Sequence, residues 1–261
     1  MEHRVRILLI GATGVLGAPA ARALAGAGHE VSGTSRSARK LAALEADGIR
    51  GVAVDLLDRS SVDAAIAACR PDAIVHLATD LADLDYAGNA TLRTDGTRIL
   101  VDAALAAGVG RVIAESVSWT VDDPAVASLE REVARVPVGV VLRFGLLYGV
   151  GTWYAPDGAF TARAATGAVA GIMPVTNWVH VDDAVAAVRP ALDWPAGAVD
   201  LVDDEPAELL DWATVLARRA GFDGDVQATV RGEGRVTDNR AARSLGWTPS
   251  RPTWRDGLGL A

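Results

Sequence analysis

Three glycines near the start of the chain have the spacing of a loop that binds phosphate. Gly11, Gly14 and Gly17 follow the apolar run 5–10 and open the amphipathic stretch 15–27. In such a loop the first glycine permits a tight turn, the second lets the backbone approach a pyrophosphate, and the third lets helix and strand pack closely. The start of the helix adds free N–H groups and the positive end of its dipole. The sequence therefore predicts a dinucleotide site formed by Gly11, Thr13, Gly14, Val15, Leu16 and Gly17.

The end of the second apolar run bears on the choice of cofactor. NAD sites usually carry Asp or Glu there to bind the ribose 2′-hydroxyl, whereas this chain has Ser35 and Arg36. A guanidinium can pair with a 2′-phosphate. NADP(H) is therefore favoured over NAD(H), the alternative being that Arg36 only begins a solvated helix. Asp55 and Leu56, after the third run, are expected to flank the adenine.

The elements that must position these residues alternate between strand and helix. Short apolar runs occur at 5–10, 30–34, 51–54, 73–77, 111–115 and 138–143, and between them lie helical stretches at 15–27, 38–47, 60–69 (with Ser60 as N-cap) and 91–107. This alternation predicts an α/β fold, a Rossmann-type doubly wound parallel sheet with helices on both faces. No apolar run approaches the ~18 residues of a membrane span, so no membrane partner is expected.

Composition excludes several classes of function. The 261 residues carry a net charge of −8, which argues against nucleic acid as a partner because such binding depends on Lys and Arg. The single cysteine, Cys69, excludes a disulfide framework and a cysteine zinc site. No histidine pair has ligand spacing, so no metal is expected. The chain shows no signal peptide, and a cytoplasmic location is expected.

The composition of the chain changes after Leu147. Glycines and prolines become frequent there, and most of the tryptophans lie in this second part. We expect a dinucleotide-binding Rossmann core formed by 1–147 with 178–202. A small C-terminal substrate-binding lobe would comprise 148–177 with 203–261. Its tryptophans favour a small-molecule substrate, for which a bulky apolar compound is one option, although they also suit the core of a small lobe.

Several motifs together resemble a known family. They are Asp55-Leu56, Val75-His76-Leu77-Ala78, Gly96-Thr97, the strand Val141-Leu142-Arg143-Phe144-Gly145, Tyr148-Gly149, Trp178-Val179-His180-Val181-Asp182-Asp183-Ala184 and Leu245-Gly246-Trp247-Thr248-Pro249. With the glycine loop, they make the chain similar to the extended (atypical) short-chain dehydrogenase/reductase superfamily, also called the NAD-dependent epimerase/dehydratase family. The resemblance implies that the cofactor lies over the carboxyl ends of the strands and also contacts Leu77, Ala78, Thr79 and Phe144. Many relatives pair through two helices, here 91–107 and 125–135; the second is short and charged, so both a monomer and a homodimer are open.

The family's catalytic dyad is absent from this sequence. Its redox chemistry uses Tyr-x-x-x-Lys with a Ser or Thr, where the Tyr hydroxyl exchanges a proton with the substrate and the Lys lowers the Tyr pKa. Lys40 is the only lysine, and none of the three tyrosines has a lysine four positions later. Candidates for the catalytic groups are Ser116 and Ser118, at the end of the fifth run, and Tyr148 and Tyr154, after the sixth.

Three functions follow from an intact glycine loop without the dyad. The first is an NADP(H)-binding oxidoreductase or epimerase, with unusual catalytic residues, that acts on a small carbonyl or hydroxyl compound, for example in secondary metabolism. The second is a non-redox lyase, isomerase or cyclase on the same fold. The third is a catalytically silent protein that senses NADP(H).

Overall fold

The apolar runs form one central sheet in the computed structural model, which describes residues 4–81 and 84–258. The strand order is β11-β6-β5-β4-β1-β2-β3, and the register is parallel from β3 through β2, β1 and β4 to β5. Its strands are β1 (Arg6–Ile10), β2 (Glu30–Ser35), β3 (Arg50–Ala53), β4 (Ala73–His76), β5 (Arg111–Val117), β6 (Val138–Phe144) and β11 (Gly197–Leu201). The reversal of strand order beside β1 is that of a doubly wound Rossmann sheet, so the predicted fold class is confirmed.

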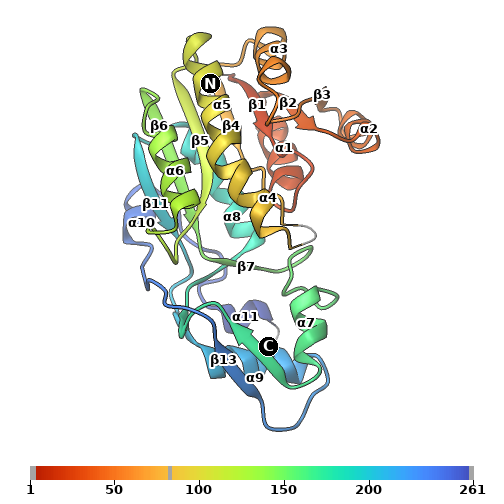
Figure 1. The fold of residues 1–261 in the computed structure, drawn as a ribbon, viewed down its shortest axis with the longest axis vertical. Helices are drawn as coiled ribbons and strands as arrows, with labels where there is room; N and C mark the ends of the chain where they lie inside the picture. Colours follow the sequence, from red (N-terminus) through yellow and green to blue (C-terminus); the bar gives the residue numbers. More distant parts are fainter. Residues whose placement is uncertain (1–3, 82–83, 259–261) are drawn as a thin grey trace. The chain divides into compact units, whose positions relative to one another are not determined.

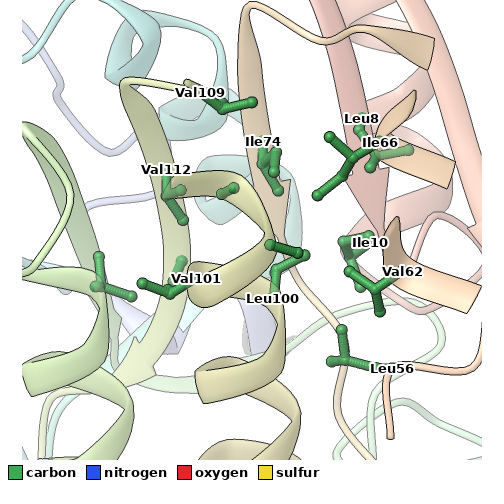
Figure 2. Packing of buried hydrophobic residues seen from close by; sticks show 14 of the residues in the cluster. Leu8, Ile10, Leu56, Val62, Ile66, Ile74, Leu100, Val101, Val109 and Val112 are labelled. Carbon is green, nitrogen blue, oxygen red and sulfur yellow. The ribbon is translucent and has the colours of Figure 1, made fainter. Parts of the chain in front are cut away.

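Helices cover both faces of this sheet, because its strands are apolar on both sides. On one face α3 (Arg59–Cys69), α5 (Thr97–Ala106) and α6 (Pro124–Val133) pack side by side (Figure 1). Leu8 and Ile10 of β1 join Leu100 and Val101 of α5 in the buried cluster on this face (Figure 2). The alternate β1 residues are also buried, and α1 (Gly17–Gly26) contacts β1 and β2. Next along the chain comes α2 (Ala38–Ala46).

The helices differ from their predicted bounds, and two of the differences have a clear structural cause. Helix α3 begins at Arg59, because the side chain of Asp58 accepts the N–H of Ser60 and is the N-cap in place of Ser60. The predicted helix 91–107 consists of the π-helical turn η1 (Leu92–Gly96) followed by α5, and it is preceded by α4 (Tyr86–Thr91), which was not predicted. Such turns insert one residue into a helix and are frequent at functional sites. Here η1 carries Arg93.

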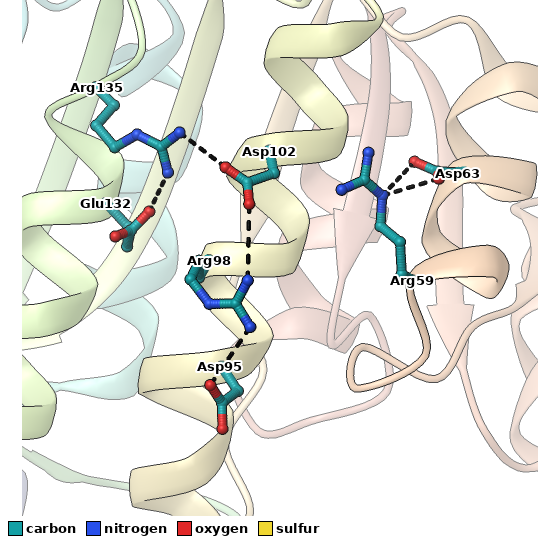
Figure 3. A network of polar contacts seen from close by, with 7 residues as sticks. All are labelled: Arg59, Asp63, Asp95, Arg98, Asp102, Glu132 and Arg135. Atoms are coloured by element: carbon teal, nitrogen blue, oxygen red, sulfur yellow. Dashed lines mark hydrogen bonds and ion pairs between the residues drawn. The ribbon is translucent and has the colours of Figure 1, made fainter.

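A charged network covers the outer surface of α5 and α6. Asp95, Arg98, Asp102 and Arg135 form a chain of ion pairs that ends at Glu132, and Arg59 pairs separately with Asp63 (Figure 3). The pairs within this chain are partly exposed, so each contributes little to stability. The network makes this surface polar.

The chain divides into two compact units. The first comprises 1–116, 122–142 and 188–198, and the second 117–121, 143–187 and 199–261. In the second unit β10 (Trp178–His180) pairs in parallel with β7 (Leu146–Tyr148), and residues 178–187 belong to this unit. The remaining elements are β7 (Leu146–Tyr148), α7 (Ala159–Ala164), β8 (Ala168–Gly171), β9 (Val175–Thr176), β10 (Trp178–His180), α8 (Val181–Val188), the 3₁₀ turn η2 (Pro190–Leu192), β12 (Ala207–Glu208), α9 (Leu209–Arg219), β13 (Gln227–Val230), α10 (Arg240–Ser244) and α11 (Trp254–Leu258).

Candidate functional site

The glycine loop lies between β1 and α1, and close packing requires two of its glycines. Gly11 has a φ of +82°, and a Cβ there would lie 2.6 Å from the backbone nitrogen of Ala78. A Cβ on Gly17 would lie 1.9 Å from the carbonyl oxygen of Gly11. The first glycine therefore lets the segment after β4 run beside the loop, and the third brings the start of α1 against the turn.

Gly14 differs from its two neighbours in the motif. Within 4 Å, a Cβ there would meet only the Gly11 oxygen, at 3.4 Å. Packing within the protein therefore does not explain a glycine here, whereas close approach of a phosphate does. No side chain caps α1, its first turn holds no acidic residue, and Val15 is 43% exposed although apolar. The start of α1 is thus open to an anion, and these residues fit the pyrophosphate of a dinucleotide.

The end of β2 presents Arg36 to solvent, as the sequence indicates, but also places a carboxylate beside it. The Arg36 guanidinium lies 3.8 Å from the carboxylate of Asp80, and both side chains are well exposed. Sequence reasoning considered the end of β2 alone and missed Asp80, which follows β4. Strands β2 and β4 both pair with β1 in parallel, so their carboxyl ends lie at the same edge of the sheet. Ser35 accepts a hydrogen bond from the backbone N–H of Ser37.

The residues after β3 shape their own loop. The Asp55 carboxylate is exposed and accepts the N–H of Leu57 at 3.0 Å, while the Asp55 N–H donates to the Ser61 hydroxyl. Leu56 is buried and packs against Gly96 of η1. The adenine contacts expected of Asp55 and Leu56 stay predictions.

A buried histidine holds the segment that follows β4. His76 is 1% exposed, its Nδ1 accepts the N–H of Ala78 at 3.4 Å, and its Nε2 lies 3.3 Å from the Thr97 hydroxyl. Burial, with a smaller effect from the Arg93 guanidinium, lowers the pKa of His76 to about 4. The imidazole is therefore neutral near pH 7, with its proton on Nε2. It ties Leu77, Ala78 and Thr79, the predicted cofactor contacts, to helix α5.

A polar cluster lies at the carboxyl end of β5. Arg93 of η1 is within 3.3 Å of Glu115, and both side chains are 11% exposed. Burial raises the pKa of the Glu115 carboxyl, against the opposite effect of Arg93. The hydroxyl of Ser116 donates to the Glu130 carboxylate of α6 at 2.9 Å. Sequence reasoning missed Arg93 and Glu115; a glutamate inside an apolar strand was the available signal.

The four predicted catalytic residues are not in one unit. Ser116 belongs to the first unit, and Ser118, Tyr148 and Tyr154 to the second. Ser118 is fully buried, and its hydroxyl has no hydrogen-bond partner in the described part of the chain. Its backbone N–H donates to Phe144, the remaining predicted cofactor contact, which is 2% exposed.

The two tyrosines belong to an aromatic cluster inside the second unit. Tyr148 is fully buried, and its hydroxyl lies 3.5 Å from the Thr253 carbonyl. Burial, with the carboxylates of Asp203 and Asp183, raises the pKa of the Tyr148 hydroxyl, which opposes a part in proton exchange through the anion. Tyr154 is 5% exposed and stacks on Phe160 with ring centroids 5.2 Å apart.

Comparisons with known proteins agree with this architecture. Residues 7–135 match the profile of the NAD dependent epimerase/dehydratase family. A "3-diazoavenalumate denitrifying reductase" from a Streptomyces species is 39% identical, with 98% of this chain and 99% of the relative covered. A "2'-dehydrokanamycin reductase" from Streptomyces kanamyceticus is 29% identical over 73% of this chain and 59% of its own length. The fold also matches the Thermus thermophilus UDP-glucose 4-epimerase in complex with NAD, at a TM-score of 0.78, 20% identity and coverage of 97% and 96%.

The chain belongs to the NAD-dependent epimerase/dehydratase family. It is an enzyme of the oxidoreductase/epimerase type, and its family depends on a nicotinamide nucleotide. Within the residues that the structure describes, no helix is long and apolar enough to cross a membrane. Over the same residues, no group of three or more His, Cys, Asp or Glu side chains is arranged to hold a metal ion.

Proposed function

We propose that the protein is an NADPH-dependent reductase whose hydride acceptor needs no proton from the protein, and that the acceptor is an aromatic diazo group. One observation carries this proposal: the glycine loop is intact while the sequence holds no Tyr-x-x-x-Lys. The relative that matches almost the whole chain is named as a denitrifying reductase of a diazo compound. The reaction that this name describes would not need the Tyr-Lys dyad, because it transfers no proton.

The proton balance of the two kinds of reduction explains this. Hydride addition to a carbonyl leaves charge on oxygen, so a proton donor is needed. When hydrogen replaces an aryl diazonium group, the reduced nicotinamide supplies a hydride, a C–H bond forms and the C–N bond breaks. Dinitrogen leaves with the electron pair of that bond. The charges of cation and hydride cancel, and no proton is transferred.

The polar cluster at the carboxyl end of β5 is compatible with a cationic acceptor. It includes the carboxyl groups of Glu115 and Glu130 and the guanidinium of Arg93, and His76 is neutral. A carboxylate beside the acceptor would favour a cation. Ser116, hydrogen-bonded to Glu130, would orient that carboxylate rather than act as a nucleophile.

The preference for NADPH is supported by Arg36, whose guanidinium is exposed at the end of β2. The 2′-phosphate of NADP(H) would then compete with Asp80 for this guanidinium. The pair is exposed and 3.8 Å apart, so it is weak and a phosphate can displace it. The sequence-based expectation of NADP(H) over NAD(H) therefore stands as part of the proposal.

An isotope experiment tests the reaction. An aryl diazonium salt with ¹⁵N at both nitrogens is incubated with the protein and with NADPH that carries deuterium at both C4 positions of the nicotinamide, with protein-free solution as the control. We expect one ¹⁵N₂ for each NADPH consumed and deuterium on the ring carbon that carried nitrogen. NADPH consumption without deuterium at that carbon, or no consumption above the control, would refute the proposal.

A second candidate is reduction of a carbonyl group, which the similarity to the dehydrokanamycin reductase favours. The Ser116–Glu130 pair would then deliver the proton. In that case Glu130→Gln should lower kcat strongly, because it removes the proton donor. For the diazo reaction the same change should have a much smaller effect on kcat, because no proton is transferred.

A further inference from the structure

The second unit contains a cavity of about 280 Å³ to which the proposed function assigns no role. One side of it is aromatic and is formed by Tyr154, Phe160 and Trp212, with Leu216 beside them. Tyr154 stacks on Phe160 at an interplanar angle of 19° and meets Trp212 edge-on at 86°. Flat aromatic faces and edges at these angles suit a planar aromatic guest.

The other side of the cavity is cationic. Arg163 of α7 and Arg231, which follows β13, line it together with Gln227 and Thr229. Among the residues that the structure describes, no carboxylate lies within ion-pair distance of either guanidinium. Arg163 lies 5.5 Å from the ring centroid of Phe160, a cation–π contact that keeps it over the aromatic wall. Two guanidinium groups without acidic partners in an acidic protein form a site for an anion.

We propose that this cavity binds a planar aromatic carboxylate. The ring lies against Tyr154, Phe160 and Trp212, and the carboxylate is held by Arg163 and Arg231. The inference rests on the proposed function in one respect, that the aromatic acid is the hydride acceptor. The cavity volume of about 280 Å³ is just below the usual range of pockets for small molecules, which runs from about 300 to 1,000 Å³. That size suits a single-ring acid better than a nucleotide sugar.

The test is direct binding, measured by calorimetry with and without NADPH. The probes are 4-coumarate and its neutral amide, which share size and ring but differ in charge. The variants are the double substitution Arg163→Gln with Arg231→Gln and, as matched control, Arg218→Gln, an exposed arginine of α9 outside the cavity. All three arginines are exposed, so the fold should be retained, which thermal unfolding checks.

We expect the wild type to bind 4-coumarate at least tenfold more tightly than the amide. The double variant should lose about tenfold or more in affinity for the acid, keep its affinity for NADPH and no longer distinguish the two probes. Arg218→Gln should behave as the wild type. Equal binding of acid and amide by the wild type, or no effect of the double substitution, would overturn the inference, as would tighter binding of UDP-glucose at the same site.

These results separate the two proposals. If the acid binds as expected but no hydride reaches any diazo acceptor, the cavity assignment holds and the proposed reaction is wrong. If deuterium is transferred but the double variant keeps the KM of an aromatic acid acceptor, the reaction holds and the cavity assignment is wrong.

Discussion

Acidification should weaken the protein through one buried side chain, His76. The folded state holds its imidazole neutral down to a pKa of about 4, against 6.5 for a free imidazole. A group whose pKa is depressed by folding contributes stability above its unfolded pKa and loses it as the pH falls toward the folded pKa. The window therefore runs from pH 6.5 down to about pH 4. At about 1.36 kcal/mol per pH unit, His76 should cost the protein on the order of 3 kcal/mol across it.

Urea unfolding of the wild type and of His76→Gln at several pH values isolates this effect, since the glutamine does not titrate. The readout is how the stability difference between the two proteins changes with pH, not its absolute value. Thr97→Val is the matched control, because it removes the partner of Nε2 and leaves the imidazole titratable. Parallel loss of stability in the wild type and His76→Gln between pH 6.5 and 4 would refute the reasoning.

Protonation of His76 should also weaken the binding of the cofactor. A charged imidazole carries a proton on Nδ1 and cannot accept the N–H of Ala78. The segment Leu77–Ala78 would then shift away from the Gly11 turn that it contacts. We expect the dissociation constant for NADPH to rise on acidification in the wild type but not in His76→Gln. A constant that rises equally in both would place the effect elsewhere.

Four further predictions follow from the same structure. Burial raises the pKa of Asp203 to about 8. The stability that this side chain contributes is therefore complete below pH 3.8 and is lost as the pH rises toward 8. Asp203→Asn should remove that loss, which is about 2–3 kcal/mol between pH 5 and pH 7 in urea unfolding. Gly17→Ala should cost about 1–3 kcal/mol of stability because its Cβ meets backbone, whereas Gly14→Ala should unfold as the wild type does and bind NADPH at least tenfold more weakly by fluorescence titration. Arg36→Asp should weaken NADPH binding about tenfold without weakening NADH binding, while Asp80→Asn should strengthen NADPH binding a few-fold. An unchanged preference in both would remove the NADPH assignment. The charged surface of α5 and α6 should leave the protein monomeric in light scattering, and a stable dimer would contradict this.

Most of the fold could be predicted from local patterns in the sequence. The glycine loop, the strands and most helices depend on residues close together in the chain, so spacing and capping were enough to predict them. The N-cap of α3 was misplaced by two residues because Asp58 and Ser60 are both good caps, and the carboxylate accepts the N–H of Ser60 itself. The interruption of the helix after Thr91 was missed, because a π turn has no sequence signature of its own.

The site depended more on contacts between distant residues. Arg93 of η1 meets Glu115 of β5, and Arg36 after β2 meets Asp80 after β4, through contacts that link separate elements of the fold. The burial of Tyr148 could not be read from its position after β6, because it depends on α11 packing over the ring. Sequence alone therefore predicted the glycine loop between β1 and α1, but not the contacts that Arg93, Glu115 and Asp80 make in the fold.

The placement of the tryptophans has a spectroscopic consequence. Only Trp194 lies in the first unit, and the other six, including the fully buried Trp178, Trp212 and Trp254, lie in the second. Intrinsic emission of this protein is thus an optical reporter of the second unit, nearly blind to the unit that holds the glycine loop. Bound NADPH emits at longer wavelength and would report the first unit. A single heated sample, observed in two emission channels, can therefore show whether the two units melt together or in sequence.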